Sequence, residues 1–491
     1  MSIFLFCRFN ELNRQLMKIL KRVAILLFSI SLIWALLVLF NSYQIFSTVN
    51  EYSKATSNNS KLEELDASLE KNSSELLRYL SIPPFRQLLG GLGLDLSPIK
   101  PEIQFATSNF SQILGYEKPQ RYLISFQNSA EARGTGGILG AFAVIEFDRG
   151  KLKVKKTGSN AILKSISTLP VELPDEYFKL YGNNPGIWQN ANLSPHFPYG
   201  ARNYLELWRL QFGESLDGVI AVDPTAMSHI LKATGPITLD DGQEITSENV
   251  VEITLATAYK KYETDNAARK QFLVKIMDAT FKKLLNKDFS RQKLPSAIVK
   301  GILENRILFY SKNQQVERAS INTRISGVLT KTQNNEYRVV IQNIDASKLD
   351  YYLVRDVEIK SLTCDAVRKT QVQVYLKNVV TNAQNLPAYV LTRADKNKPK
   401  ELITGQHRFK LFIYGPYKSS LIGGSIASTS NIQGKKGEEL GRPIFITDID
   451  LAPGASEVVV AQFKGGTGPL TFVDQPLVIP TTHTSTISDS C

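Results

Sequence analysis

The chain has 491 residues, which is enough for two or three domains, each with its own hydrophobic core. Hydrophobic residues make up 43% and charged residues 21% of the sequence, which excludes an intrinsically disordered chain. The net charge of +12 suits an anionic partner, but the basic residues are dispersed and form no stripe, so we do not expect nucleic-acid binding.

An uncharged apolar stretch near the N-terminus predicts a membrane anchor. Residues 23–40 contain no charged side chain, and with Asn41 to Tyr43 they form a helix about long enough to cross a bilayer core. Basic residues before the stretch outnumber the single acid there, Glu11, and they predict a cytoplasmic N-terminus: Arg8, Arg14, Lys18, Lys21 and Arg22. We therefore expect a cytoplasmic segment at 1–22, a single transmembrane helix at 23–43 and an extracytoplasmic bulk in the cell membrane.

A cleaved signal peptide is the rival interpretation of this stretch. Signal peptides have a shorter apolar run that ends at a small-residue cleavage site. Here the run continues into SYQIFSTVNEY, which is a poor site, so we favour an uncleaved anchor. Residues 44–117 follow as a helical stalk and linker, with leucines at helical spacing: Leu62, Leu65, Leu69, Leu76, Leu77 and Leu80.

The cysteines are too few to define a framework. Cys364 and Cys491 lie on the expected outer side, where they are able to pair in an oxidising compartment, but the sequence does not decide whether they do. The chain contains no cluster of cysteine and histidine with the spacing of a structural zinc site.

Residues 118–315 alternate strand and helix patterns. Tyr122–Phe126 and Ile138–Phe147 read as buried strands, and Val219–Val222 reads as another. Asp223 follows as a helix N-cap, with Pro224 at the first helical position. This alternation predicts an α/β domain, in which helices cover a sheet.

From residue 316 to 491 the pattern changes to short β-rich runs split by turns. No convincing helix interrupts them, so we expect an all-β, sandwich-like domain. The runs are Tyr337–Ile344, Asp356–Leu362, Gln371–Leu376, Phe409–Tyr414 and Glu457–Phe463.

A charged, glycine-rich turn, EARGTGG, joins the first two expected strands. Gly136 and Gly137 allow close backbone approach to a ligand, and the guanidinium of Arg133 suits a phosphate or carboxylate. The alternative is a structural turn in which Glu131 and Arg133 pair with each other or with their neighbours, and the motif alone favours this alternative.

A second basic segment, YETDNAARKQF, opens an expected helix. Asp265, Arg269 and Lys270 lie at its entry, and a helix N-terminus attracts anions, so Arg269 there suits a phosphate. The alternative is a solvated first turn with Asp265 as its cap. Asp217 and Asp223 bracket the expected strand at Val219–Val222, as a turn residue and a helix cap, and either is able to ligate Mg²⁺, although nothing in their spacing demands a metal.

Several separated motifs together resemble the bacterial domain of unknown function 4012. They are RYLISFQNSAEARGTGGILGAFAVIEFDRGKL, SPHFP and LDGVIAVDPTAMSHILKATGPITLDDG, with KLDYYLVRDVEI farther on. The resemblance implies a membrane-anchored protein of the cell envelope whose activity is not established. His196, in SPHFP, stands where this family commonly has Asp.

The order of elements is also distantly similar to that of LytR-CpsA-Psr proteins. Those are envelope phosphotransferases that move glycan polymers from polyprenyl pyrophosphate carriers to the cell wall. Glu131-x-Arg133 stands where they have Asp-x-Arg, and Arg269-Lys-Gln271 stands where they have Arg-Gln. This resemblance implies that Arg133 and Arg269 grip a pyrophosphate. It also implies that Glu131, Asp217 or Asp265 assists a Mg²⁺ cofactor, or that Glu131 orients Arg133. The chain has no counterpart to the family's Ser-Ile-Pro-Arg-Asp segment.

Two hypotheses follow. In the first, the protein binds a polyprenyl-phosphate-linked glycan through Arg133 and Arg269 and transfers it to a cell-wall polymer, as a Mg²⁺-dependent phosphotransferase. In the second, it is a non-catalytic adhesion or scaffold protein. Arg133 and Arg269 within reach of one phosphate favour the first hypothesis, and side chains that point apart favour the second.

Overall fold

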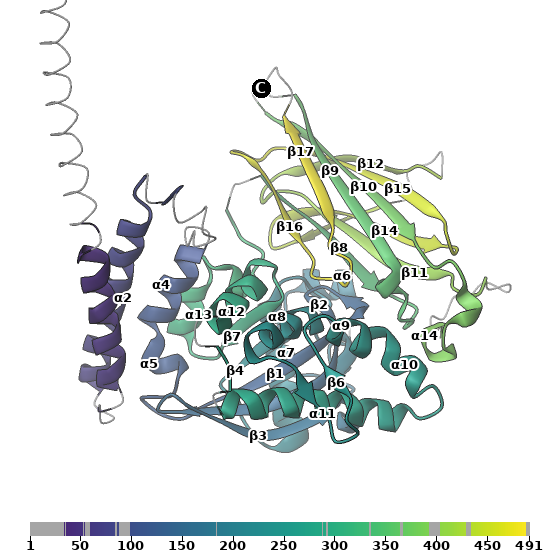
Figure 1. Cartoon of the computed structure of the whole chain (residues 1–491). Coiled ribbons are helices and arrows are strands. Elements are labelled where there is room, and N and C mark those ends of the chain that lie inside the picture. Colours follow the sequence, from purple (N-terminus) through teal and green to yellow (C-terminus); the bar gives the residue numbers. More distant parts are fainter. Residues whose placement is uncertain are drawn as a thin grey trace, which may run out of the picture. The chain divides into compact units, whose positions relative to one another are not determined.

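The computed structural model describes residues 34, 36–52, 54, 59–83, 86–87, 99–182, 184–286, 288–290, 293–332, 335–363, 367–391, 403–428 and 434–487 (Figure 1). The chain splits into two compact units, Met1–Pro119 and Gln120–Cys491, which are described separately. The three cysteines lie outside the described residues, and the Cys364–Cys491 pairing stays open.

The first unit is helical where it is described. Its elements are a helix that continues to residue 52, α2 (Asn59–Leu80), α4 (Lys100–Ser108) and α5 (Phe110–Ile113). Leu62, Leu65 and Leu69 of α2 pack with Tyr52 in a small core, as their spacing predicts. The hydroxyl of Tyr52 donates a hydrogen bond to the buried Asp66, which ties two helices together.

The expected transmembrane helix at 23–43 receives no support. Most of it, residues 23–33 and 35, lies outside the described residues, as does the expected cytoplasmic segment 1–22. Within the described part of the chain, no helix combines the length and the apolar character needed to cross a membrane.

The second unit begins with a mixed five-stranded sheet in the order β3-β2-β1-β4-β7. β1 and β4 are parallel, and the other neighbours are antiparallel. The strands are β1 (Gln120–Arg133), β2 (Gly136–Asp148), β3 (Lys151–Ser159), β4 (Gly218–Val222) and β7 (Ile307–Ser311).

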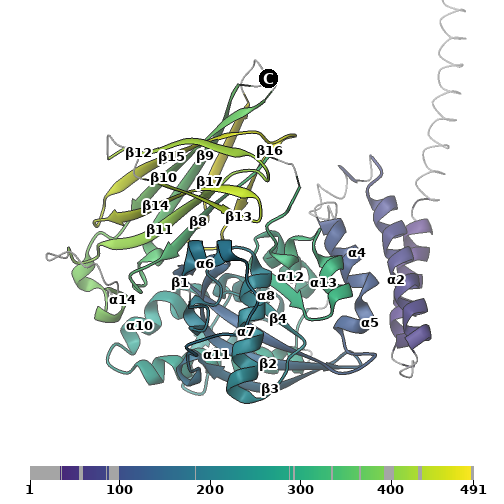
Figure 2. The same ribbon diagram turned by 180° about the vertical axis from the view of Figure 1, so that it is seen from behind.

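Helices cover this sheet (Figures 1 and 2). α7 (Phe197–Phe212) packs Trp208 against Phe142 of β2 in one core, whereas α8 (Pro224–Thr234) and α11 (Asn266–Leu285) share a second core. The remaining helices are α6 (Asp175–Tyr181), α9 (Val250–Glu252), α10 (Ala258–Lys261), α12 (Lys293–Leu303), α13 (Gln314–Ser320) and α14 (Ala388–Leu391), and the short strands β5 (Ile237–Thr238) and β6 (Glu244–Ile245) form a separate hairpin.

The predicted cap at Asp223 is confirmed. Its carboxylate accepts a hydrogen bond from the amide of Ala226, and Pro224 occupies the first turn. A second partner was not predicted: Asp223 also forms a buried ion pair with Arg306, which lies before β7. One side chain therefore caps α8 and fixes it beside the sheet.

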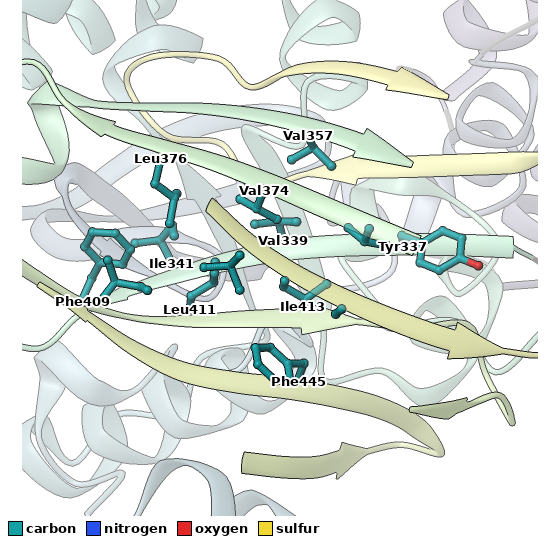
Figure 3. Close-up of a cluster of buried hydrophobic side chains, with 14 of the residues drawn as sticks. Tyr337, Val339, Ile341, Val357, Val374, Leu376, Phe409, Leu411, Ile413 and Phe445 are labelled. Carbon is teal, nitrogen blue, oxygen red and sulfur yellow. The ribbon is translucent and has the colours of Figure 1, made fainter. Parts of the chain in front are cut away.

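The rest of the unit is a β-sandwich of two five-stranded sheets, with orders β12-β15-β10-β9-β17 and β13-β14-β11-β8-β16. Figure 3 shows side chains of both sheets meeting in one core, Tyr337 and Ile413 from one sheet and Val357 and Val374 from the other. The strands are β8 (Asn335–Asn343), β9 (Leu353–Thr363), β10 (Lys369–Asn378), β11 (His407–Tyr414), β12 (Ser420–Ile426), β13 (Lys435–Glu439), β14 (Arg442–Leu451), β15 (Ser456–Lys464), β16 (Leu470–Asp474) and β17 (Thr482–Ile487). An α/β sheet with helices followed by a β-rich region is thus confirmed.

Candidate functional site

The EARGTGG segment is the tip of the β1–β2 hairpin. Between Asn128 and Ala132 the pairing with β2 is interrupted, so that Glu131 lies in a bulge of β1. A Cβ added to Gly137 would lie 2.0 Å from the carbonyl oxygen of Asn128, and one on Gly134 would lie 2.2 Å from that of Leu193. These two glycines are therefore required by close packing within the protein.

The tip is held by the β-sandwich. The amide of Ala132 donates to Asp350 at 2.9 Å, and the side chain of Gln475 donates to the carbonyl of Arg133 at 2.7 Å. Gly136 has φ +133°, and an added Cβ there would meet the side chain of Gln127 at 2.7 Å. The tip is thus a joint between the α/β sheet and the sandwich.

Arg133 is buried, and protein groups engage its guanidinium. Nε donates to the carbonyl of Gln189 at 2.8 Å, and Nη1 donates to the carbonyls of Ala132 and Asn343. Nη2 donates to Glu131 at 3.1 Å. The structural alternative for this segment, in which Glu131 and Arg133 pair, is the arrangement that the structure contains.

Glu131 connects the tip to a second cation. Its other oxygen accepts from Nζ of Lys348 at 2.6 Å, and both side chains are almost fully buried. Burial opposes the charged form of Lys348, but the attraction of Glu131 outweighs it and raises the pKa of Lys348 above its usual range. Sequence reasoning missed Lys348, because nothing in SKLDYY distinguishes its lysine from a surface one.

The start of α11 lies at the far end of the same chain of contacts. Nζ of Lys348 lies 5.1 Å from the ring centre of Tyr389, and the guanidinium carbon of Arg269 lies 4.9 Å from that ring and 4.3 Å from the ring of Tyr259. Arg269 is buried and hydrogen-bonds to Asn266. Arg133 and Arg269 are therefore connected through Glu131, Lys348 and Tyr389, but they do not share one exposed pocket.

We call Arg269, Lys270 and Lys348 the cationic cluster. Lys270 is partly exposed, and its pKa is lowered by burial and then by the positive charges of Arg269 and Lys348. Within the described residues the cluster's ion pair is the one between Lys348 and Glu131. One of the three cations is thus paired with a carboxylate, and the other two are left for an anionic ligand.

An apolar slot of about 50 Å³ lies beside the cluster. Asn128 joins the two features, because it lines the slot and its side chain donates to the hydroxyl of Tyr259 at 2.7 Å. A π-helical turn, Ile253–Thr257, contributes two of the lining residues, and such turns are frequent at functional sites. The lining residues are Phe126, Gln127, Asn128, Gly140, Ala141, Pro224, Met227, Thr254, Leu255, Leu273, Ile276 and Met277.

The two candidate metal ligands occupy separate places. Asp217 lies before β4, where it accepts from the amide of Arg121 near the start of β1, at the opposite end of β1 from the tip. Asp265 is the N-cap of α11 and accepts from the amide of Ala268 at 2.8 Å. No group of three acidic, histidine or cysteine side chains able to hold a metal occurs within the described residues. Mg²⁺ therefore stays a prediction.

His196 is a partly buried packing residue. Its Nδ1 accepts from the amide of Leu329 at 3.1 Å, and its ring packs on Tyr199. Burial, followed by the nearby positive charges, lowers the pKa of His196 to about 3, so the ring stays neutral. Trp188 and Trp208 are fully buried, which excludes both from a carbohydrate platform.

Sequence reasoning also missed a buried ion pair below the hairpin tip. Nε2 of His407 lies 3.2 Å from Oδ1 of Asp350 without hydrogen-bond geometry, and both residues are inaccessible to solvent. Burial alone would lower the pKa of His407, but the charge of Asp350 outweighs it and raises this pKa. The pair places a charged group against the tip, because Asp350 also accepts from Ala132.

Comparison with known proteins identifies the part of the chain that contains the tip. Residues 117–259 match the family described as protein of unknown function (DUF4012). The resemblance seen in the sequence is confirmed over this span. The DUF4012 match holds β1 to β4, α8 and the π-helical turn, whereas Arg269, Lys270 and Lys348 lie beyond it. No curated protein matches the chain.

Solved structures with weak likeness also exist. The transcriptional regulator yvhJ from Bacillus subtilis is 12% identical over 43% of this chain and 78% of its own, with a TM-score of 0.24. Protein gbs0355 from Streptococcus agalactiae is 14% identical over 43% of this chain and 74% of its own, with a TM-score of 0.27. Lin1025 from Listeria innocua is 8% identical over 45% of this chain and 85% of its own, with a TM-score of 0.22. At these scores the likenesses support no inference about fold or activity.

Proposed function

We propose that the protein is a membrane-anchored, extracytoplasmic protein of the bacterial cell envelope that binds a polyprenyl-phosphate-linked glycan and presents it to a cell-wall acceptor. The observation that carries the proposal is the adjacency of the cationic cluster and the apolar slot. A phosphate attached to a lipid has one charged end and one apolar end. The site offers a partner to each.

Helix α11 arranges the two ends on one face. Arg269 lies in its first turn, and Leu273 and Ile276 follow four and seven residues later, which places all three on the same side of the helix. The positive end of the helix dipole adds to the charge of Arg269. A phosphate at the start of α11 would therefore direct its lipid tail along the helix into the slot.

The charges of the cluster also favour an anion. Arg269 and Lys348 oppose the protonation of Lys270, and a bound phosphate would relieve that repulsion. Arg133 contributes to this arrangement from behind, by holding the Glu131 to which Lys348 is bound. This assignment moves the phosphate contact from Arg133 to Lys270 and Lys348, and it retains Arg269.

The slot is narrow, so the tail enters only when helices move. About 50 Å³ holds no more than a few carbon atoms, whereas occupied ligand pockets measure about 300–1,000 Å³. Leu273 and Ile276 of α11 and Met227 of α8 form its outer wall. Lipid binding therefore requires α11 or α8 to move away from the sheet.

Transfer of the glycan is the finer part of the proposal. In phosphoryl transfer the protein mainly positions the reactants and neutralises developing charge, and the cluster supplies cations for both tasks. Mg²⁺ remains a candidate cofactor from the resemblance alone.

The competing function is a non-catalytic scaffold or adhesion protein. One observation favours it. The resemblance assigns Glu131 and Arg133 to catalysis, but their hydrogen bonds join the α/β sheet to the sandwich. In this view the cationic cluster is a packed joint in which Tyr389 covers Arg269 and Lys348.

Mass spectrometry of lipids that co-purify with the full chain in detergent separates the two functions. The wild type is compared with Arg269→Ala/Lys270→Ala, and Lys435→Ala/Lys436→Ala serves as the control because both lysines are exposed on β13. We expect a polyprenyl phosphate or pyrophosphate with the wild type and the control, and at least a tenfold loss with the cluster variant. Folded wild-type protein without such a lipid would support the scaffold.

A further inference from the structure

A second cavity of the second unit lies on another side of the hairpin tip. It is a cleft of about 640 Å³, within the size range of small-molecule sites. Gly134 and Thr135 of the tip and Pro195 form one wall, and β8, β16 and β17 of the sandwich form the other. β16 pairs with β8 in one sheet, and β17 pairs with β9 in the other (Figure 1).

The cleft is electrically balanced, in contrast to the cationic cluster. Its lining contains two arginines and two acids: Arg324, Arg338, Glu336 and Asp474. Arg338 pairs with Glu336 at 2.9 Å, and Asp474 lies 3.5 Å from the buried Arg355 and accepts from Thr481. These charges are largely neutralised within the protein, so the cleft offers little to a phosphate or a carboxylate.

Uncharged polar side chains form part of the accessible rim. The side chains of Asn322, Thr332 and Ser485 are exposed, and none has a hydrogen-bond partner within the described part of the chain. Together they offer an amide and hydroxyls, which both donate and accept hydrogen bonds. The floor is apolar, and Phe472 presents a partly buried ring whose centre lies 5.1 Å from that of His483.

We propose that this cleft binds a neutral saccharide of a few sugar units. Sugar hydroxyls need groups that both donate and accept, and the C–H face of a sugar packs on apolar and aromatic surface. The balanced charge excludes a strongly ionic ligand, and the concave shape suits a chain end. The site is distinct from the cationic cluster and does not rest on the proposed function.

The test is saturation-transfer NMR with the full chain in detergent, with tetra-N-acetylchitotetraose, an uncharged oligosaccharide, as the probe. We expect saturation transfer from the wild-type protein to the saccharide. The variant Asn322→Ala/Thr332→Ala should bind the saccharide with at least a tenfold weaker affinity. The control is Thr381→Ala/Asn382→Ala, which removes the same two exposed side-chain types from the loop after β10. A second variant, His483→Ala, examines the aromatic edge and should weaken binding by several-fold.

Two results would overturn the proposal. One is the absence of saturation transfer from the wild-type protein to the saccharide at a millimolar saccharide concentration. The other is transfer that persists unchanged in both cleft variants, because the saccharide would then bind elsewhere. Arg269→Ala/Lys270→Ala should bind the probe like the wild type, so a failure of the lipid hypothesis and a failure of the saccharide site give different results.

Discussion

The hairpin tip and the start of α11 look alike in sequence but differ in structure. Each brings an arginine and an acid together in a short polar segment. At the tip, Arg133 bonds to three backbone carbonyls and to Glu131, and it joins two parts of the fold. At the start of α11, Arg269 bonds to Asn266 and lies over two tyrosine rings, and the adjacent Lys270 is partly exposed.

The difference shows what makes a basic residue available to a ligand. A buried arginine must have its donors satisfied, and at the tip backbone carbonyls already fulfil that requirement. Aromatic rings contact a cation without consuming its donors. Arg269 at the start of α11 therefore keeps N–H donors for an anion. At the tip, the donors of Arg133 are bonded within the protein and stabilise the fold.

The largest expected effect is at the tip. Glu131→Gln removes the charge that compensates Arg133 and Lys348, and it should lower the free energy of unfolding by about 3–5 kcal/mol. Denaturant unfolding of the full chain measures this. Asp148→Asn, which breaks an exposed pair with Lys153, is the control and should change little. Equal effects of the two variants would contradict a structural tip.

The buried pair beneath the tip should make stability depend on pH. His407→Gln leaves Asp350 buried without its cation and should cost about 3 kcal/mol at pH 5. Because the pKa of His407 is raised in the folded state, its contribution is complete below the usual value of 6.5 and is lost as pH rises through the raised pKa. The difference in the free energy of unfolding between wild type and variant should therefore shrink toward high pH. A difference that grows with pH would show that His407 and Asp350 do not form a stabilising ion pair.

A smaller effect on the free energy of unfolding is expected at the start of α11. Asp265→Ala removes the cap of α11 and should lower the free energy of unfolding by about 1 kcal/mol. If Asp265 instead holds a required metal, added Mg²⁺ should raise the melting temperature of the wild type and not that of the variant. Equal melting temperatures with and without Mg²⁺ would limit Asp265 to capping.

The smallest effect on stability is expected at Lys270. Its ammonium lacks a carboxylate partner within the described residues and suffers repulsion from Arg269 and Lys348, so Lys270→Ala should change the free energy of unfolding by no more than about 0.5 kcal/mol. Thermal unfolding of the purified variant measures this. A large loss would show that Lys270 is structural, as Arg133 is.

Local signals in the sequence predicted much of the fold. The cap at Asp223 and the buried face of α2 follow from patterns within a few residues, and both are present. The β-rich region is recognisable because its short β-rich runs are separated by turns and no helical pattern interrupts them. What local patterns do not contain is the partner of a side chain far along the chain, such as Arg306 for Asp223.

The candidate site shows the same limit. The sequence singled out Arg269, which lies in the cluster, but Lys348 and Tyr389 come from the sandwich part of the chain, and their spacing carries no signal. From the sequence, the glycines of the tip are also predicted to allow a ligand to approach the backbone closely. The space is filled by Leu193 and Asn128, whose backbones approach Gly134 and Gly137. Only long-range packing decides between these outcomes.

We propose that the start of α11, and not the hairpin tip, receives a phosphate. It is tested most directly by calorimetric titration of the full chain with geranyl pyrophosphate, a short water-soluble prenyl pyrophosphate. Lys270→Glu is compared with the wild type and with Lys436→Glu, a charge reversal on exposed β13. We expect binding by the wild type and the control, and at least a tenfold weaker affinity with Lys270→Glu. Equal affinity in all three proteins, or no binding by the wild type, would contradict it.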